Sequence, residues 1–135
     1  ARNLRKSDLN KFLKKIDILS IHCPLNKNTE NLISIKELKL MKKDSIIINT
    51  ARGGIINEKD LVFALKKRIV SAAGIDVTTM EPPKKTHPYY KIINSPYFIW
   101  TPHTAWASDE TLKNALDQLI ENINSFYSGK PKNLV

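Results

Sequence analysis

Several residue types are scarce in this 135-residue chain, and each shortage argues against a class of protein or site. The single cysteine, Cys23, cannot form an internal disulfide, so nothing in the sequence implies an oxidising compartment. No window approaches the roughly 18 continuous apolar residues that span a bilayer, and the amino terminus has no apolar core like that of a signal peptide. We therefore expect a cytoplasmic protein with no membrane partner.

Glycine and acidic residues are also few. The four glycines, at positions 53, 54, 74 and 129, cannot form the G-x-G-x-x-G turn that binds phosphate in complete dinucleotide-binding domains. The chain has 13 acidic residues and 22 lysines and arginines, which gives it a net charge of +9. A charge of this sign can attract nucleic acid. The lysines are scattered through every segment, so we expect a solvated basic surface and no nucleic-acid partner. We also expect no metal site. A nucleic-acid-binding domain is the alternative, and a steep salt dependence of DNA affinity would support it.

The remaining sequence alternates between two kinds of pattern. Apolar residues at helical spacing predict helices at residues 7–16, 34–43, 58–68 and 109–129. The last of these is expected to end at Gly129. Short apolar runs predict strands, which are residues 17–25, 44–51, 70–77 and 97–101. The loop at 78–96 contains four prolines, and a loop of that length in a compact domain is usually functional. The pattern predicts an α/β fold, a doubly wound parallel sheet covered on both faces.

Ligands of open parallel sheets bind outside the carboxyl ends of the strands, and this chain places reactive residues there. Arg52 follows the strand at 44–51, and His103 follows the strand at 97–101. Asp76 comes directly after the apolar residues "VSAAGI", and Glu81 comes a few residues later. Each has an ordinary alternative as a surface arginine, a loop carboxylate or a turn histidine. Together they suit binding a small carboxylic acid and moving a proton while a hydride moves to or from carbon.

Three ordered motifs, "INTARGGIINEKDLVFAL", "AAGIDVTTMEPP" and "TPHTAWAS", make the sequence recognisable. They resemble the carboxy-terminal motifs of the D-isomer-specific 2-hydroxyacid dehydrogenases, and "DILSIHCPLNKNTENLI" resembles the segment that precedes them in that family. The resemblance covers essentially the whole chain. Because of the tryptophan in "HTAW", the sequence most resembles the glycerate dehydrogenase (hydroxypyruvate reductase) branch of the family.

The resemblance implies a catalytic role for residues in these motifs. Arg52 matches the arginine that binds the substrate carboxylate, His103 the acid/base, and Glu81 the carboxylate paired with that histidine. Trp106 would form a wall of the substrate pocket, or would only pack in the core. The implied substrate is a small 2-oxo or 2-hydroxy acid such as hydroxypyruvate or glycerate.

The resemblance also implies NAD or NADP as the cofactor. Asp76 matches the aspartate that contacts the nicotinamide carboxamide, and Thr50 and Ala51 border the nicotinamide. Cys23 and Pro24 fall where the family lines the adenine end of the dinucleotide.

By the same resemblance, residues 1–135 are the carboxy-terminal part of an NAD(P)-binding domain. They would supply strands 3 to 6 of a Rossmann-like sheet and lack its first two strands and the separate substrate domain. In the order 3-2-1-4-5-6, the missing strands would lie between the strands at 17–25 and 44–51, leaving two apolar edges exposed. We expect a fragment that is inactive alone and a full-length homodimer. The alternative is a non-catalytic fragment or binding module that has lost coenzyme binding.

Overall fold

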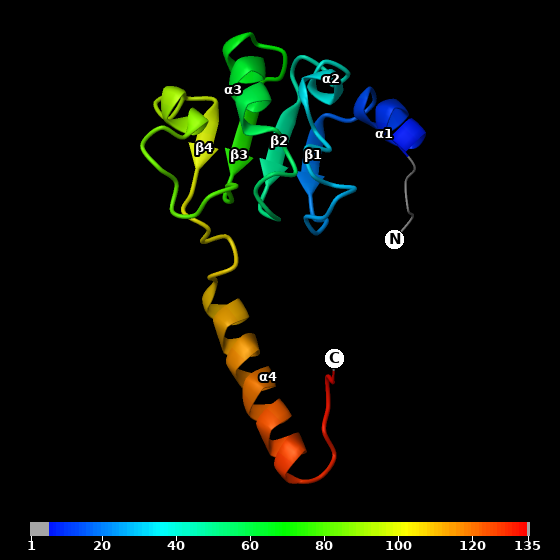
Figure 1. The fold of residues 1–135 in the computed structure, drawn as a ribbon, viewed down its shortest axis with the longest axis vertical. Coiled ribbons are helices and arrows are strands. Elements are labelled where there is room, and N and C mark those ends of the chain that lie inside the picture. Colours follow the sequence, from blue (N-terminus) through cyan, green and yellow to red (C-terminus); the bar gives the residue numbers. More distant parts are fainter. Residues whose placement is uncertain (1–5, 135) are drawn as a thin grey trace. The chain divides into compact units, whose positions relative to one another are not determined.

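The computed structural model describes residues 6–134 in two units, the first ending at His103 and the second beginning at Thr104 (Figure 1). The first unit is built on a four-stranded sheet. Its strands are β1 (Ile18–Ile21), β2 (Ile46–Asn49), β3 (Ala72–Ile75) and β4 (Phe98–Trp100). All three pairings are parallel, so the predicted partial α/β sheet is confirmed.

The helices of the first unit lie before β1 and between the strands. They are α1 (Lys6–Leu13), α2 (Ile35–Leu38), α3 (Glu58–Lys66) and the 3₁₀ helix η1 (Pro88–Lys91). The α2 helix is far shorter than the predicted segment 34–43, because the amides of Leu40 and Met41 bond to carbonyls three residues back in tight turns. The η1 turn lies inside the proline-rich loop, where no helix was predicted.

The order of the strands differs from the prediction. The sheet runs β1-β2-β3-β4, and β1 pairs directly with β2 from Ile18 opposite Ile46 to Ile21 opposite Asn49. The expectation that two absent strands would lie between them is therefore wrong. Four strands that are adjacent both in sequence and in space cannot include both strand 3 and strand 4 of the 3-2-1-4-5-6 order, since strands 2 and 1 separate those two.

The two faces of the sheet are not buried equally. One face packs into the core through alternate strand residues, which are Leu19, Ile21, Ile47, Ala73, Ile75 and Phe98. On the other face Ile18, Ile46 and Ile99 are 57%, 37% and 68% exposed, so the described helices of the first unit cover one face of the sheet. Right-handed crossovers between strands laid down in one direction all fall on the same face, which explains the asymmetry.

The second unit contains one long helix, α4 (Asp109–Tyr127), within the predicted segment 109–129. Ser108 caps it, because the Ser108 hydroxyl accepts the amide hydrogen of Thr111 at 3.2 Å. Its apolar stripe is exposed along its length, comprising Leu112, Leu116, Leu119, Ile120, Ile123 and Tyr127. Among the described residues, no helix is long and apolar enough to cross a membrane.

Candidate active site

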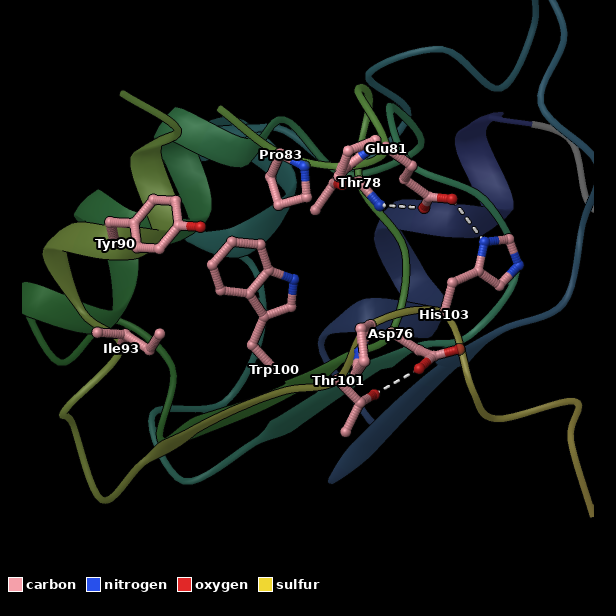
Figure 2. A pocket seen from close by; sticks show the side chains of 11 residues that line it. Asp76, Thr78, Glu81, Pro83, Tyr90, Ile93, Trp100, Thr101 and His103 are labelled. Carbon is pink, nitrogen blue, oxygen red and sulfur yellow. Dashed lines mark hydrogen bonds and ion pairs between the residues drawn. The ribbon is translucent and has the colours of Figure 1, made fainter. Parts of the chain in front are cut away.

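The carboxyl ends of β3 and β4 bring Asp76 and His103 together. Beyond the last paired residues, the Thr101 amide donates to the Ile75 carbonyl at 3.0 Å, and the His103 amide donates to the Asp76 carbonyl at 2.9 Å. The segments after the two strands therefore stay paired as far as His103. A cavity of about 500 Å³ opens here, and Asp76, Glu81 and His103 all line it (Figure 2).

Glu81 and His103 form the central pair of this site. Oε2 of Glu81 lies 2.6 Å from Nδ1 of His103, and the Thr78 amide donates to Oε1 of Glu81 at 2.9 Å (Figure 2). Burial raises the pKa of the Glu81 carboxyl, but the Thr78 hydrogen bond, the His103 hydrogen bond and the His103 charge together hold that pKa below its ordinary value. The pair is thus a carboxylate that orients an imidazole ring.

The backbone at His103 supports a functional reading of this pair. His103 has a φ of 57°, in the left-handed region that a non-glycine residue occupies at an energetic cost. Such strained residues cluster at active sites. The His103 side chain is 39% exposed, so the ring is held by Glu81 and is still accessible from solvent.

Asp76 is the most buried ionisable residue of the site. It is 3% exposed, and its Oδ1 accepts a hydrogen bond from the Thr101 hydroxyl. Thr101 was not among the predicted site residues. Its sequence signal was available, because it is the polar residue that ends the apolar run "YFIWT".

The loop that follows β2 carries Arg52, and Asn49 fixes its shape. The buried Asn49 side chain donates to the Arg52 carbonyl at 3.0 Å and accepts the Ala51 amide hydrogen at 3.0 Å. Thr50 and Arg52 are exposed, and Nη1 of Arg52 donates to the Ala51 carbonyl at 2.7 Å. Arg52 lies at the same sheet edge as Asp76, but it is outside the described lining of the cavity.

Gly53 allows the loops after β2 and β3 to touch. A Cβ atom at Gly53 would lie 2.0 Å from the Thr78 carbonyl carbon and 2.4 Å from the Thr79 nitrogen. Only a residue without Cβ fits there. Gly53 therefore sets how closely the Arg52 loop approaches Thr78, whose amide holds Glu81.

The remaining predicted residues are Cys23, Pro24 and Trp106. Cys23 and Pro24 follow β1, where Cys23 packs partly buried against the core and the exposed Pro24 carbonyl accepts the Thr29 hydroxyl hydrogen at 2.7 Å. Trp106 is 55% exposed and belongs to the second unit. Within residues 6–134, no group of three or more His, Cys, Asp or Glu side chains is arranged to hold a metal ion.

Beyond its strand ends, this parallel sheet presents a histidine paired with a carboxylate, a buried aspartate and an arginine. This arrangement is typical of the ligand-binding edge of an α/β coenzyme-binding domain. Comparison with known proteins gives the particular family. Residues 1–105 match the model described as "D-isomer specific 2-hydroxyacid dehydrogenase, NAD binding domain". The chain belongs to this family.

Individual relatives agree with this assignment. The chain is 43% identical over 128 residues to a glycerate dehydrogenase of Methylorubrum extorquens, and 38% identical over 133 residues to a hydroxypyruvate reductase of Blautia hydrogenotrophica. These matches cover 95% and 98% of the chain but only 40% of each relative. A crystal structure of D-lactate dehydrogenase with NAD+ from Lactobacillus jensenii superposes with a TM-score of 0.84 at 31% identity, covering 93% of this chain and 41% of that one.

Proposed function

We propose that the full-length protein carrying this chain transfers hydride between a nicotinamide cofactor, NAD or NADP, and a small D-2-hydroxy acid or 2-oxo acid. The observation that carries the proposal is the Glu81–His103 pair, with 2.6 Å between its atoms, beside Asp76 at the strand ends. The relatives named glycerate dehydrogenase and hydroxypyruvate reductase support glycerate and hydroxypyruvate as the substrate pair.

The proposed chemistry assigns one task to each side chain. Arg52 binds the substrate carboxylate, since a guanidinium matches a carboxylate with two parallel hydrogen bonds. His103, in its protonated form, donates a proton to the carbonyl oxygen during reduction, and Glu81 orients the ring and stabilises its positive charge. Trp106 is proposed as a wall of the substrate pocket.

The residues beyond β2 and β3 fit one end of the cofactor. Asp76 offers an acceptor to the nicotinamide carboxamide, and Thr50 and Ala51 follow β2 beside it. When bound, the nicotinamide supplies or accepts the hydride. Cys23 and Pro24, after β1, are proposed to border the adenine end.

Purified full-length protein tests the proposal directly. Its turnover is measured with NADH and with NADPH on hydroxypyruvate, pyruvate and a 2-oxo acid with a large side chain. The proposal predicts reduction of at least one small 2-oxo acid to the D-alcohol. Absence of turnover with both coenzymes and every acid, in a folded protein, contradicts it.

A second candidate applies to the 135-residue chain alone, because its four glycines do not form a phosphate-binding turn. We propose that this chain by itself is an inactive fragment or binding module that does not hold coenzyme tightly. Calorimetry with NADH tests this idea, and tight binding contradicts it. For the full-length protein we propose a cytoplasmic homodimer, which size-exclusion chromatography with light scattering tests for its dimeric state.

A further inference from the structure

The loop between β3 and β4 carries Glu81, and one carboxylate outside the cavity holds this loop near its start and at its middle. That carboxylate is Glu58, in the first turn of α3. Its Oε1 accepts the Thr79 amide hydrogen at 2.7 Å, and its Oε2 accepts the Thr79 hydroxyl hydrogen at 2.9 Å. Nε2 of His87 lies 2.9 Å from the same Oε2. The side chains of Glu58 and His87 are only 10% and 6% exposed, so water competes little for these contacts.

The hydrogen on His87 can be placed from its second contact. Nδ1 of His87 accepts the Tyr89 amide hydrogen at 3.3 Å, so Nδ1 carries no hydrogen. Nε2 is then the protonated nitrogen, and it donates to Glu58. The Glu58 carboxylate thus receives three hydrogens from the loop, two from Thr79 near its start and one from His87 at its middle.

The start of the loop connects Glu58 to the catalytic pair. Thr78 and Thr79 are consecutive, and their amides bind two different carboxylates. The Thr78 amide donates to Glu81, while the Thr79 amide donates to Glu58. The two peptide planes meet at the Cα of Thr78, so holding the Thr79 amide limits the Thr78 amide to the directions that the φ and ψ angles of Thr78 allow.

The middle of the loop connects Glu58 to β4, the strand that precedes His103. The His87 ring stacks on Trp100, with centroids 5.5 Å apart and planes 27° from parallel. Trp100 ends β4 and lines the cavity with His103 (Figure 2). Glu58 is therefore linked to both members of the Glu81–His103 pair, through Thr79 on one side and His87 on the other.

We propose that Glu58 is a positioning residue, which sets the Glu81–His103 geometry by tying Thr79 and His87 to α3. The inference rests on the proposed function, because it concerns how the acid–base pair of that reaction is held. The competing interpretation is that Glu58 serves only stability, as an acidic residue in the first turn of a helix. The two interpretations differ in what happens to the pH dependence of catalysis.

The test is Glu58→Gln in the full-length protein, with hydroxypyruvate and NADH or NADPH as substrates. A glutamine has one acceptor oxygen and two N–H donors, so it cannot accept all three hydrogens, and its amide faces a donor. We expect kcat to fall roughly three- to tenfold. We also expect the alkaline limb of the kcat/KM profile to move to lower pH by about 0.5 to 1 unit, because a displaced Glu81 stabilises the imidazolium less.

Asp60→Asn is the matched control. Asp60 lies in the same turn of α3, but its carboxylate accepts the Ile35 amide hydrogen at 2.9 Å and so ties α3 to α2. It should lower thermal stability by an amount similar to that of Glu58→Gln and leave the pH profile in place. Thr79→Val is a milder second variant, which removes one of the three hydrogens and should move the alkaline limb in the same direction by a smaller amount.

An unchanged pH profile in Glu58→Gln overturns the proposal, as does an equal shift in Asp60→Asn. If Glu58→Gln does not fold, an unchanged profile in Thr79→Val overturns it instead. These outcomes are distinct from failure of the proposed function, in which wild-type protein has no turnover or His103→Ala keeps it. A dead His103→Ala together with an unshifted Glu58→Gln would refute only the role of Glu58.

Discussion

The substitution Gly53→Ala tests whether close contact between two loops holds the catalytic pair in place. The added Cβ atom would lie 2.0 Å from the Thr78 carbonyl carbon and 2.2 Å from its oxygen, where ordinary contact begins at 3.4 Å. The loops must therefore separate by about 1.4 Å. The obstacle is backbone, so a change of side-chain rotamer cannot relieve it.

The expected cost follows from this geometry. Overpacking a rigid site costs about 3 kcal/mol, which should lower the midpoint of thermal unfolding by roughly 10 °C or more for a unit of this size. The displaced Thr78 amide no longer holds Glu81, so kcat of the full-length protein should fall by more than about tenfold.

The assay compares Gly53→Ala with Gly74→Ala. Gly74 lies in β3, and none of the described residues comes within 4 Å of a Cβ added there. Alanine at this position should be neutral or stabilise the chain by about 0.5 kcal/mol, because it restricts the unfolded state. Thermal unfolding of the 135-residue chain by circular dichroism measures stability, and turnover is measured in the full-length protein. Equal stability and turnover for the two variants would refute the role given to the loop contact.

The other predictions concern residues at the same sheet edge. Arg52→Ala should raise KM for the 2-oxo acid by roughly a hundredfold with a smaller effect on kcat, and steady-state kinetics checks this. Asn49→Ala leaves the Ala51 amide unpaired and should cost about 1–3 kcal/mol, measured by urea unfolding. Because the pKa of Glu81 is lower in the folded state, its contribution to stability is complete above about pH 4.3 and is lost as pH falls through the lowered value. Glu81→Gln should therefore flatten the acid side of the stability profile, and an unchanged profile contradicts this.

The sequence predicted the elements of this fold because most are encoded locally. The strand ending in Asn49 and the helix beginning after Asn57 each have their own apolar pattern and boundary residue. Strand order depends on pairing between distant segments. The direct contact of β1 with β2 was therefore missed, since the family's strand numbering was applied with β1 as strand 3. Apolar composition also does not show which face of the sheet the helices of the first unit cover.

The sequence predicted those contacts of the candidate site that join one side chain to another. Glu81 and His103 belong to two motifs that resemble one family, and their hydrogen bond connects two side chains recognisable by type. The supporting contacts use backbone amides, such as the Thr78 amide on Glu81 and the Thr79 amide on Glu58. Every residue except proline carries an amide, so the sequence contains no signal that marks these two.

The most direct test of the central claim is turnover of hydroxypyruvate by wild-type and His103→Ala full-length protein, followed by the loss of NADH or NADPH absorbance. Coenzyme binding, measured in parallel by fluorescence quenching, shows whether the variant is still folded. If His103 is the proton donor, kcat falls by about a thousandfold while the coenzyme still binds. A His103→Ala variant with a near-wild-type rate contradicts the assignment of this site.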